Sequence, residues 1–230
     1  MKTSTGNKLE NQTNATKLLV NTYSILVGLT AIVHGFYETL QGNEPIKESL
    51  IDAIGPKQRL WEYSILHAVS YAPTYMIAGI LAIIMGILVI VWSLFFIEKR
   101  LRTIILFFLI ILTFLVGGGY GAPLSLGLLA ILASLRINRP ILKLNDYLSS
   151  SFKTISIKLW PASLIVLIVV FVGSVFITII GWPFVNVIGP KATNSLVWLL
   201  VPVMMISMIL AVLDALIYDG IHPYHFSQPI

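Results

Sequence analysis

Residues 102–139 read RTIILFFLIILTFLVGGGYGAPLSLGLLAILASLRINR, and this stretch decides the fold. It holds two short apolar runs, residues 104–116 and 123–135, on either side of the glycine-rich segment 117–121. Basic residues stand outside both ends, and basic residues accumulate on the cytoplasmic side of a membrane. The stretch is therefore predicted to enter a bilayer and return to the same side as a short helical hairpin, residues 103–136. We expect two short, close-packed spans with the glycine turn at or just below the outer surface, and the alternative is a re-entrant loop buried in the bundle.

The composition of the whole chain agrees with a membrane protein. Of its 230 residues, 57% are apolar and only 11% are charged, and the mean hydropathy is +0.90. Soluble domains carry about 25% charged residues, so this chain lacks the polar side chains that a soluble surface needs. The absence of cysteine excludes disulfides, thiol catalysis and cysteine-ligated metals.

The basic residues are distributed unevenly along the chain, which has a net charge of +5. Eleven of the fifteen Lys and Arg residues fall in segments that we assign to the cytoplasm. The four exceptions are Lys47, Lys57, Arg59 and Lys191. This distribution predicts a multi-pass protein of the cell membrane with both termini cytoplasmic, and it argues against nucleic acid as a partner.

Two helix pairs flank the central hairpin in the predicted fold, an all-α polytopic membrane bundle of about six transmembrane segments. The first pair covers residues 18–97 and the second covers residues 159–217. The tetrapeptide Ile-Gly-Pro-Lys occurs in the loop of each pair, at 54–57 and at 188–191, which indicates two related units. Pairs that both begin on the cytoplasmic side would form a parallel repeat.

A single transmembrane domain, residues 17–220, is predicted between two cytoplasmic tails. The tail at 1–16 is rich in Asn, Thr and Lys and is expected to be disordered, and the second tail covers residues 221–230. Residues 141–157 are expected to form a polar connection before the second pair.

The loop within the first pair is predicted to lie on the outer membrane surface. An amphipathic helix is expected within residues 42–61, where Pro45 suits a first helical turn. A second interfacial helix is expected over residues 59–71, and Pro73 separates it from the next span, 74–97.

One face of the first span carries polar residues at spacings of three and four, the period of a helix. They are Thr30, His34, Glu38 and Gln41. Ionisable groups at such depth are costly and suggest function. An imidazole and a carboxylate one turn apart can relay protons, ligate one face of a metal, or act as a general acid and base.

A structural interpretation of the same residues stands beside the functional one. Glu38 is only three residues from the loop, so it is expected among the lipid headgroups, bonded to Arg59 or Lys57. For His34, which lies deeper, a structural hydrogen bond to another helix is as well supported as a functional role.

Small residues recur where helices are predicted to pack closely. They are Gly28, Ala31 and Gly35 in the first span, Gly79, Ala82 and Gly86 in the second, and Gly117, Gly118, Gly119 and Gly121 in the hairpin turn. The Gly-Tyr-Gly run invites comparison with a potassium-channel filter, but glycines replace the Thr-Val pair of that filter. A turn that lets two short helices approach is the favoured interpretation.

The outer loop also holds a group of charged residues. Arg59, Glu62 and His67 are candidates for an outer vestibule above the His34 face, together with acidic residues of the same loop, which are Glu44, Glu48 and Asp52.

The run from His34 through Glu38 to Gln41, followed by Ile-Gly-Pro at 54–56 and by residues 117–123, resembles a family of uncharacterised (hypothetical) prokaryotic polytopic membrane proteins. The resemblance covers most of the chain. It implies the membrane class, and it implies no activity and no catalytic residues.

Three functions remain open at this stage. The favoured one is a small transporter- or channel-like protein. The alternatives are an intramembrane enzyme that acts on a lipid with His34 and Glu38 as acid and base, and a structural or accessory membrane subunit. The enzyme is less favoured because a nucleotide-binding loop, an HExxH motif and a nucleophile constellation are all missing from the sequence. The lipid bilayer is the expected partner and a small solute or lipid the expected ligand, without cofactor or metal.

Overall fold

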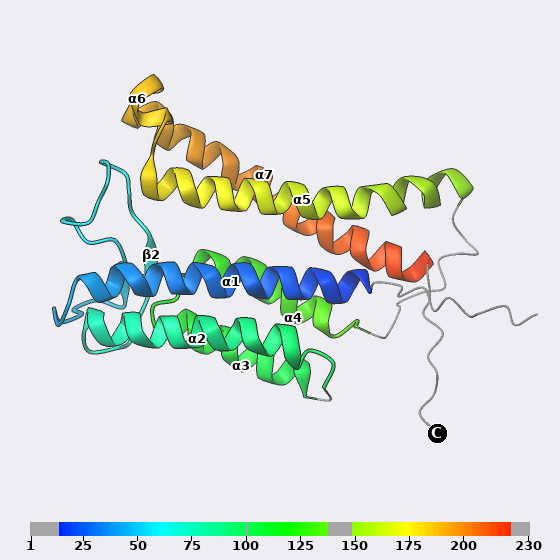
Figure 1. Ribbon diagram of the computed structural model, residues 1–230, viewed down its shortest axis with the longest axis horizontal. Coiled ribbons are helices and arrows are strands. Elements are labelled where there is room, and N and C mark those ends of the chain that lie inside the picture. Colours follow the sequence, from blue (N-terminus) through cyan, green and yellow to red (C-terminus); the bar gives the residue numbers. More distant parts are fainter. Residues whose placement is uncertain (1–13, 100, 138–148, 222–230) are drawn as a thin grey trace, which may run out of the picture.

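The computed structural model describes residues 14–99, 101–137 and 149–221. This part of the chain is mostly helical and contains one two-stranded antiparallel sheet (Figure 1). In chain order its elements are α1 (Ala15–Leu40), β1 (Leu50–Asp52), β2 (His67–Val69), α2 (Tyr75–Phe95), α3 (Arg102–Leu115), the π-helical turn η1 (Pro123–Gly127), α4 (Leu128–Ser134), α5 (Ser150–Ile180), α6 (Phe184–Ile188) and α7 (Pro190–Ile221).

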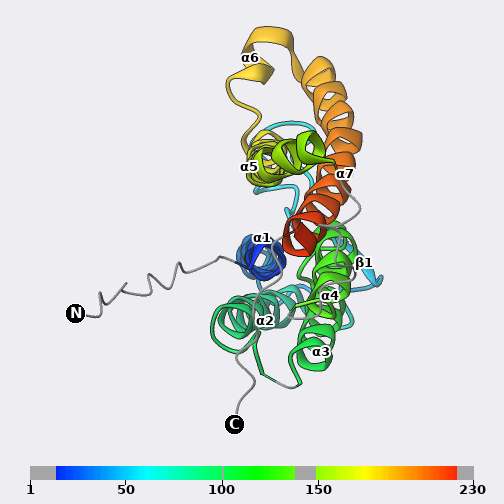
Figure 2. The same ribbon diagram turned by 90° about the vertical axis from the view of Figure 1, so that its right-hand side faces the viewer.

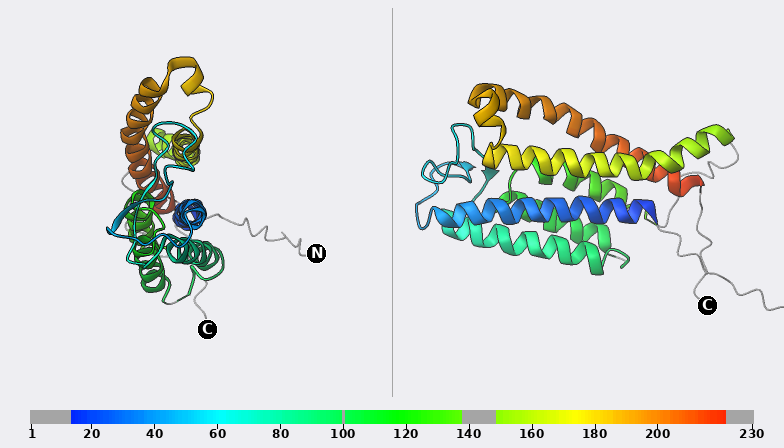
Figure 3. Two further views of the ribbon diagram at one scale, coloured as in Figure 1. Left: turned by 90° about the vertical axis from the view of Figure 1, so that its left-hand side faces the viewer. Right: turned by 45° about the horizontal axis from the view of Figure 1, so that its top comes forward.

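The long helices run side by side, so the molecule has two distinct ends (Figures 1 and 3). The β1–β2 pair and α6 lie at one end. We call it the hairpin end, after the β1–β2 pair and not after the helical hairpin of residues 103–136. The glycine segment, residues 117–121, is at the same end because Ser70 and Val116 form a β-bridge. Helix α1 begins and helix α7 ends at the opposite end, which we call the terminal end.

Helix α1 is the centre of the bundle, and it contacts α2, α4, η1 and α7 (Figure 2). Two sets of hydrogen bonds fasten it to α7. The Tyr23 hydroxyl donates to the carbonyl of Met208 at 2.7 Å. At the terminal end the Asp219 carboxylate accepts from the backbone N–H groups of Ala15 and Thr16, both at 2.9 Å. These amides belong to the first turn, where a helix has no internal acceptors for them.

Helices α1 and α2 pack backbone against backbone at their small residues. A Cβ atom on Gly28 would stand 2.5 Å from the carbonyl oxygen of Gly86, and one on Gly35 would stand 2.4 Å from that of Gly79. Carbon atoms do not approach a carbonyl oxygen so closely, so only glycine fits at these four positions. The alanines of the two motifs, Ala31 and Ala82, are fully buried.

Four helices are long and apolar enough to cross a membrane: α1, α2, the Lys158–Ile180 part of α5, and α7. The hairpin arms are apolar but shorter. Helix α3 has 14 residues, which is about 20 Å at 1.5 Å per residue, against about 30 Å of hydrocarbon. The second arm begins with the π-turn η1 and continues as α4. The structure therefore supports four spans, and the expected count of about six is not confirmed.

The loop between α1 and α2 differs from the expectation of two interfacial helices, within residues 42–61 and over residues 59–71. The chain instead pairs β1 with β2, with Ile51 opposite Ala68. Both of these central residues are buried while their strand neighbours are more exposed. This alternation is the period of a strand, and the ladder satisfies backbone groups that an isolated short helix would leave open.

Several predicted boundaries also move. Helix α1 begins at Ala15, with Asn14 accepting from the N–H of Lys17 at 2.7 Å, so the expected tail is helical at its last residues. The rest of that tail, 1–13, lies outside the described residues, as does 222–230 of the second tail. Helix α5 already begins at Ser150, inside the expected polar connection.

The two helix pairs, α1 with α2 and α5 with α7, share an antiparallel arrangement but differ in their loops. Gly189 ends α6 with a φ of +83° and Pro190 starts α7. In the first pair, by contrast, the matching Gly55 and Pro56 lie in the irregular loop after β1. The two copies of Ile-Gly-Pro-Lys therefore occupy different local structures.

Candidate functional site

The polar residues predicted for a site on the first span lie in the half of α1 nearest the hairpin end and at its C-cap, and the bundle covers three of them. Glu38 is 0% exposed, His34 is 5% exposed and Thr30 is 9% exposed. Gln41 follows as the C-cap of the helix. We call this group the α1 polar site.

The glycine segment lies directly on this site. A Cβ atom on Gly117 would stand 2.4 Å from Oε2 of Glu38, and one on Gly119 would stand 2.8 Å from Nε2 of His34. The φ angles of these two glycines are +108° and +85°, a conformation that other residues rarely adopt. Gly118, between them, is close to Ala31. The glycine run and the polar face, which the sequence presents as separate features, thus form one site.

The imidazole of His34 is held by its own helix. Its Nδ1 atom is 2.8 Å from the carbonyl oxygen of Thr30. A carbonyl can only accept, so Nδ1 carries the hydrogen in this contact and Nε2 is left toward the glycine segment. The ring also interacts with the backbone of His67, above the glycine segment. The expected structural alternative, a bond from His34 to another helix, is not among the described contacts.

Glu38 is covered by the bundle and does not bind Arg59 or Lys57, the partners that the structural interpretation gave it. Neither carboxylate oxygen has a hydrogen-bond partner in the part of the chain that the structure describes. Arg59 binds Asp52 instead, with Nη2 3.1 Å from Oδ2. A buried carboxylate without a counter-charge costs several kcal/mol, so such a group holds a proton or a bound cation.

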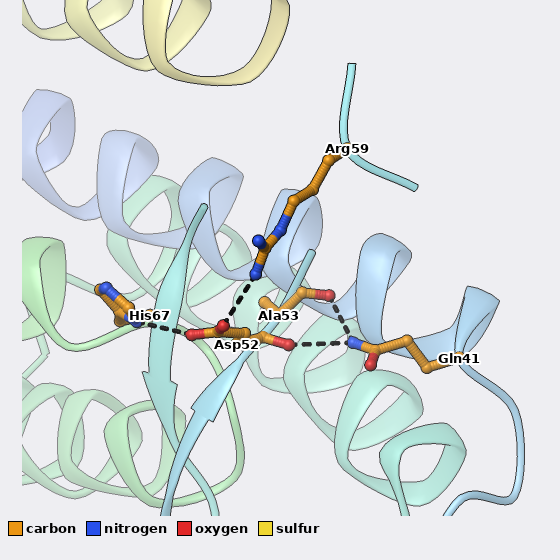
Figure 4. Close-up of polar contacts among 5 residues, drawn as sticks. All are labelled: Gln41, Asp52, Ala53, Arg59 and His67. Atoms are coloured by element: carbon orange, nitrogen blue, oxygen red, sulfur yellow. Dashed lines mark hydrogen bonds and ion pairs between the residues drawn. The ribbon is translucent and has the colours of Figure 1, made fainter. Parts of the chain in front are cut away.

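Asp52 is the centre of a second polar cluster, at the hairpin end (Figure 4). Its Oδ1 atom is 2.8 Å from Nδ1 of His67, while Oδ2 accepts from Arg59. The Gln41 amide donates to the carbonyls of Asp52, at 3.0 Å, and Ala53, at 2.7 Å. Of the predicted vestibule residues, Arg59 and His67 therefore come together on Asp52, and the exposed Glu62 takes no part in these contacts.

The β1–β2 pair is fastened on top of the glycine segment. The ring of His67 lies 6.4 Å, centroid to centroid, from that of Tyr120, with 33° between the ring planes. The N–H of Tyr71 donates to the carbonyl of Leu115 at 3.1 Å, just after which the glycine segment begins. Three layers thus follow one another: the strand pair, the glycine segment and the α1 polar site.

A polar cavity of about 440 Å³ opens beside the Asp52 cluster. Its polar lining comes from Gln41, Lys47, Glu48, Asp52 and Tyr75. Of the residues predicted to form a vestibule, Glu48 and Asp52 line this cavity, whereas Arg59, Glu62 and His67 are not among its lining residues.

Tyr75, the first residue of α2, lines this cavity together with Gln41 and Asp52. Tyr75 was not predicted as a site residue from the sequence. Its position two residues after Pro73, where the second span begins, is the signal that could have indicated it.

Among the described residues, no group of three or more His, Asp or Glu side chains is placed to hold a metal ion. No protein-family model matches this chain, and no characterised protein or solved structure is significantly similar to it.

Proposed function

We propose that this chain is a multi-pass protein of the cell membrane that acts as a small transporter- or channel-like protein, with a proton or a small cation bound at Glu38. Both termini are cytoplasmic and the hairpin end is outside in this proposal. The four apolar helices support it, and so does the sequence, in which eleven of the fifteen basic residues fall in segments that we assign to the cytoplasm. The immediate partner is the lipid bilayer.

The observation that carries the proposal is the state of Glu38. Its side chain is fully buried, and neither oxygen has a partner among the described residues. An apolar side chain of the same size would be neutral or favourable for stability at such a place. A carboxyl group that the fold does not need is best explained by what it binds, and in a membrane that is typical of proton and ion pathways.

His34 adds a second titratable group under the same cover. In the described contacts no hydrogen bond joins His34 directly to Glu38, but the glycine segment touches both side chains. A movement of this one segment would uncover both groups together. Histidine changes its charge between about pH 5 and pH 8, so His34 is suited to pass a proton to or from the buried carboxyl group.

The test is a flux measurement in liposomes that contain the purified protein. A pH-sensitive dye inside reports proton entry under a potassium diffusion potential, and a sodium-sensitive dye is used in a parallel sample. We expect Glu38→Gln to abolish the flux and His34→Gln to slow it. Glu62→Gln removes an exposed charge of the outer loop and is the matched control, which should leave the flux unchanged.

Detergent melting curves show whether each variant is folded. Absence of flux in the folded wild type, or equal flux in Glu38→Gln, would remove the transport proposal. Mass spectrometry of the same liposome lipids examines the alternative. A lipid product that depends on Glu38 would identify the chain as an intramembrane enzyme. If neither flux nor a lipid product is found, a structural or accessory subunit is the remaining candidate function.

A further inference from the structure

We infer that the glycine segment is a movable gate that opens the α1 polar site toward the hairpin end, and that His67 with Asp52 forms its latch. This inference rests on the proposed role of Glu38 and His34 and concerns the regulation of that site. It follows from how the segment is held from below and from above.

From below, the glycine segment meets α1 through its backbone alone. Gly117, Gly118 and Gly119 are buried but present no side chain to interlock with α1. Their closest neighbours on α1 are the side chains of Glu38, Ala31 and His34. Packing of interlocked side chains is what makes a protein interior rigid, and it is absent between these glycines and the two polar groups. Glycine also adopts more backbone conformations than other residues, so this segment can change shape at little cost.

From above, the segment is held through Tyr120. This side chain is 42% exposed, and its ring faces His67. His67 is in turn bound to Asp52, at 2.8 Å, and the far oxygen of Asp52 is bound to Arg59. The chain of contacts from Tyr120 to Arg59 therefore fixes the outer side of the gate to the strand pair.

The charge of His67 sets the strength of this latch. The titratable and charged groups that face it are Asp52 from β1, Tyr120 from the glycine segment and His34 from α1. A protonated His67 forms an ion pair with Asp52, whereas a neutral one keeps only a hydrogen bond. The gate is accordingly tighter at acid pH outside. A charge on His34 acts in the opposite direction, because it repels the charge on His67.

The experiment uses a thiol placed under the gate. Thr113 is fully buried beneath Gly118, and Thr113→Cys changes its size little. The chain has no cysteine of its own, so this thiol is the only one present. A membrane-impermeant methanethiosulfonate reagent is applied from outside to intact cells at about pH 5.5 and about pH 8, on either side of the histidine range. The rate is divided by that of an exposed reference, Glu62→Cys, because thiol reactivity itself rises with pH.

We expect the relative rate of the Thr113→Cys protein to be lower at the acid pH, by up to about fivefold, the size of effect that a partly exposed ion pair has on an equilibrium. Adding His67→Gln, which keeps a donor for Asp52 but cannot titrate, should remove this dependence on pH. Adding Tyr120→Ala should raise the rate at both pH values.

Two results would overturn the inference. If the thiol of Thr113→Cys reacts in the denatured protein but never from outside in the native protein, the glycine segment is not a gate. If the pH dependence persists with His67→Gln, His67 is not the latch. The labelling needs no transport, so a gate that opens in a protein without flux would separate the failure of the proposed function from the failure of this inference.

Discussion

Gly119 lies directly over the imidazole ring of His34, so close that a Cβ atom at position 119 would stand 2.8 Å from both Cε1 and Nε2. The backbone of Gly119 is therefore in close contact with a buried titratable ring, and the backbone of Gly117 is in equally close contact with the carboxyl group of Glu38. The shape of the site depends on these two residues being glycine.

The first prediction concerns that contact. Gly119→Ala should lower the melting temperature of the protein in detergent, because a positive φ costs an alanine about 1–2 kcal/mol and its methyl group would displace His34. Gly121→Ala is the matched control in the same segment, since a Cβ there would meet nothing within 4 Å. Equal melting temperatures for the two variants would contradict the described packing.

The second prediction separates stability from function at Glu38. Glu38→Met keeps the size of the side chain and removes a buried polar group that has no partner among the described residues. We expect the free energy of unfolding to stay the same or rise by about 1–3 kcal/mol, while flux in liposomes is lost. Glu62→Met, at an exposed position, should change neither. A large loss of stability in Glu38→Met would show that the carboxylate is held by a counter-charge.

The third prediction concerns the contact between α1 and α2. A Cβ on Gly79 would stand 2.4 Å from the carbonyl oxygen of Gly35, a backbone atom that cannot rotate away. Gly79→Ala should therefore force the helices apart and cost about 1–3 kcal/mol. Gly173→Ala on α5 is the control, because a Cβ there meets nothing within 4 Å. Thermal unfolding of both variants in the same detergent tests this, and a neutral Gly79→Ala would speak against the close approach.

The fourth prediction gives a sign for the dependence of stability on pH at the terminal end. The hydrogen bond and charge of Lys17 lower the pKa of Glu98 from its ordinary value of 4.5. The stabilisation by this pair is therefore fully present above the ordinary pKa of 4.5, and it is lost as the pH falls through the lowered pKa of Glu98. The Glu98 side chain is 63% exposed, so the contribution stays below about 1 kcal/mol. Glu98→Gln should melt slightly below wild type at about pH 7, and the difference should shrink as the pH falls below 4.5; a difference that grows on acidification would be the wrong sign.

The sequence predicts local features of this fold better than distant ones. The spacing of Gly28 and Gly35 is visible because helical periodicity is a property of neighbouring residues. The strand pair was missed because Ile51 finds its partner Ala68 across an irregular loop, and no local pattern announces that pairing. The cover of Glu38 by Gly117 was missed for the same reason. The polar face of the first span indicated a site, but what lies on top of that site is decided by a segment far along the chain.

The capping of α1 by Asp219 bears on the order in which the protein is made. The acceptor follows Ala15 by 204 residues, so the whole of α1 has been synthesised long before the residue that satisfies its first turn. Helix α2 can join α1 early through their glycine contacts, but the terminal end of α1 closes only when α7 is in place. In a chain interrupted before α7, the N–H groups of Ala15 and Thr16 would lack the Asp219 carboxylate as their acceptor. The start of α1 therefore differs between incomplete and complete chains.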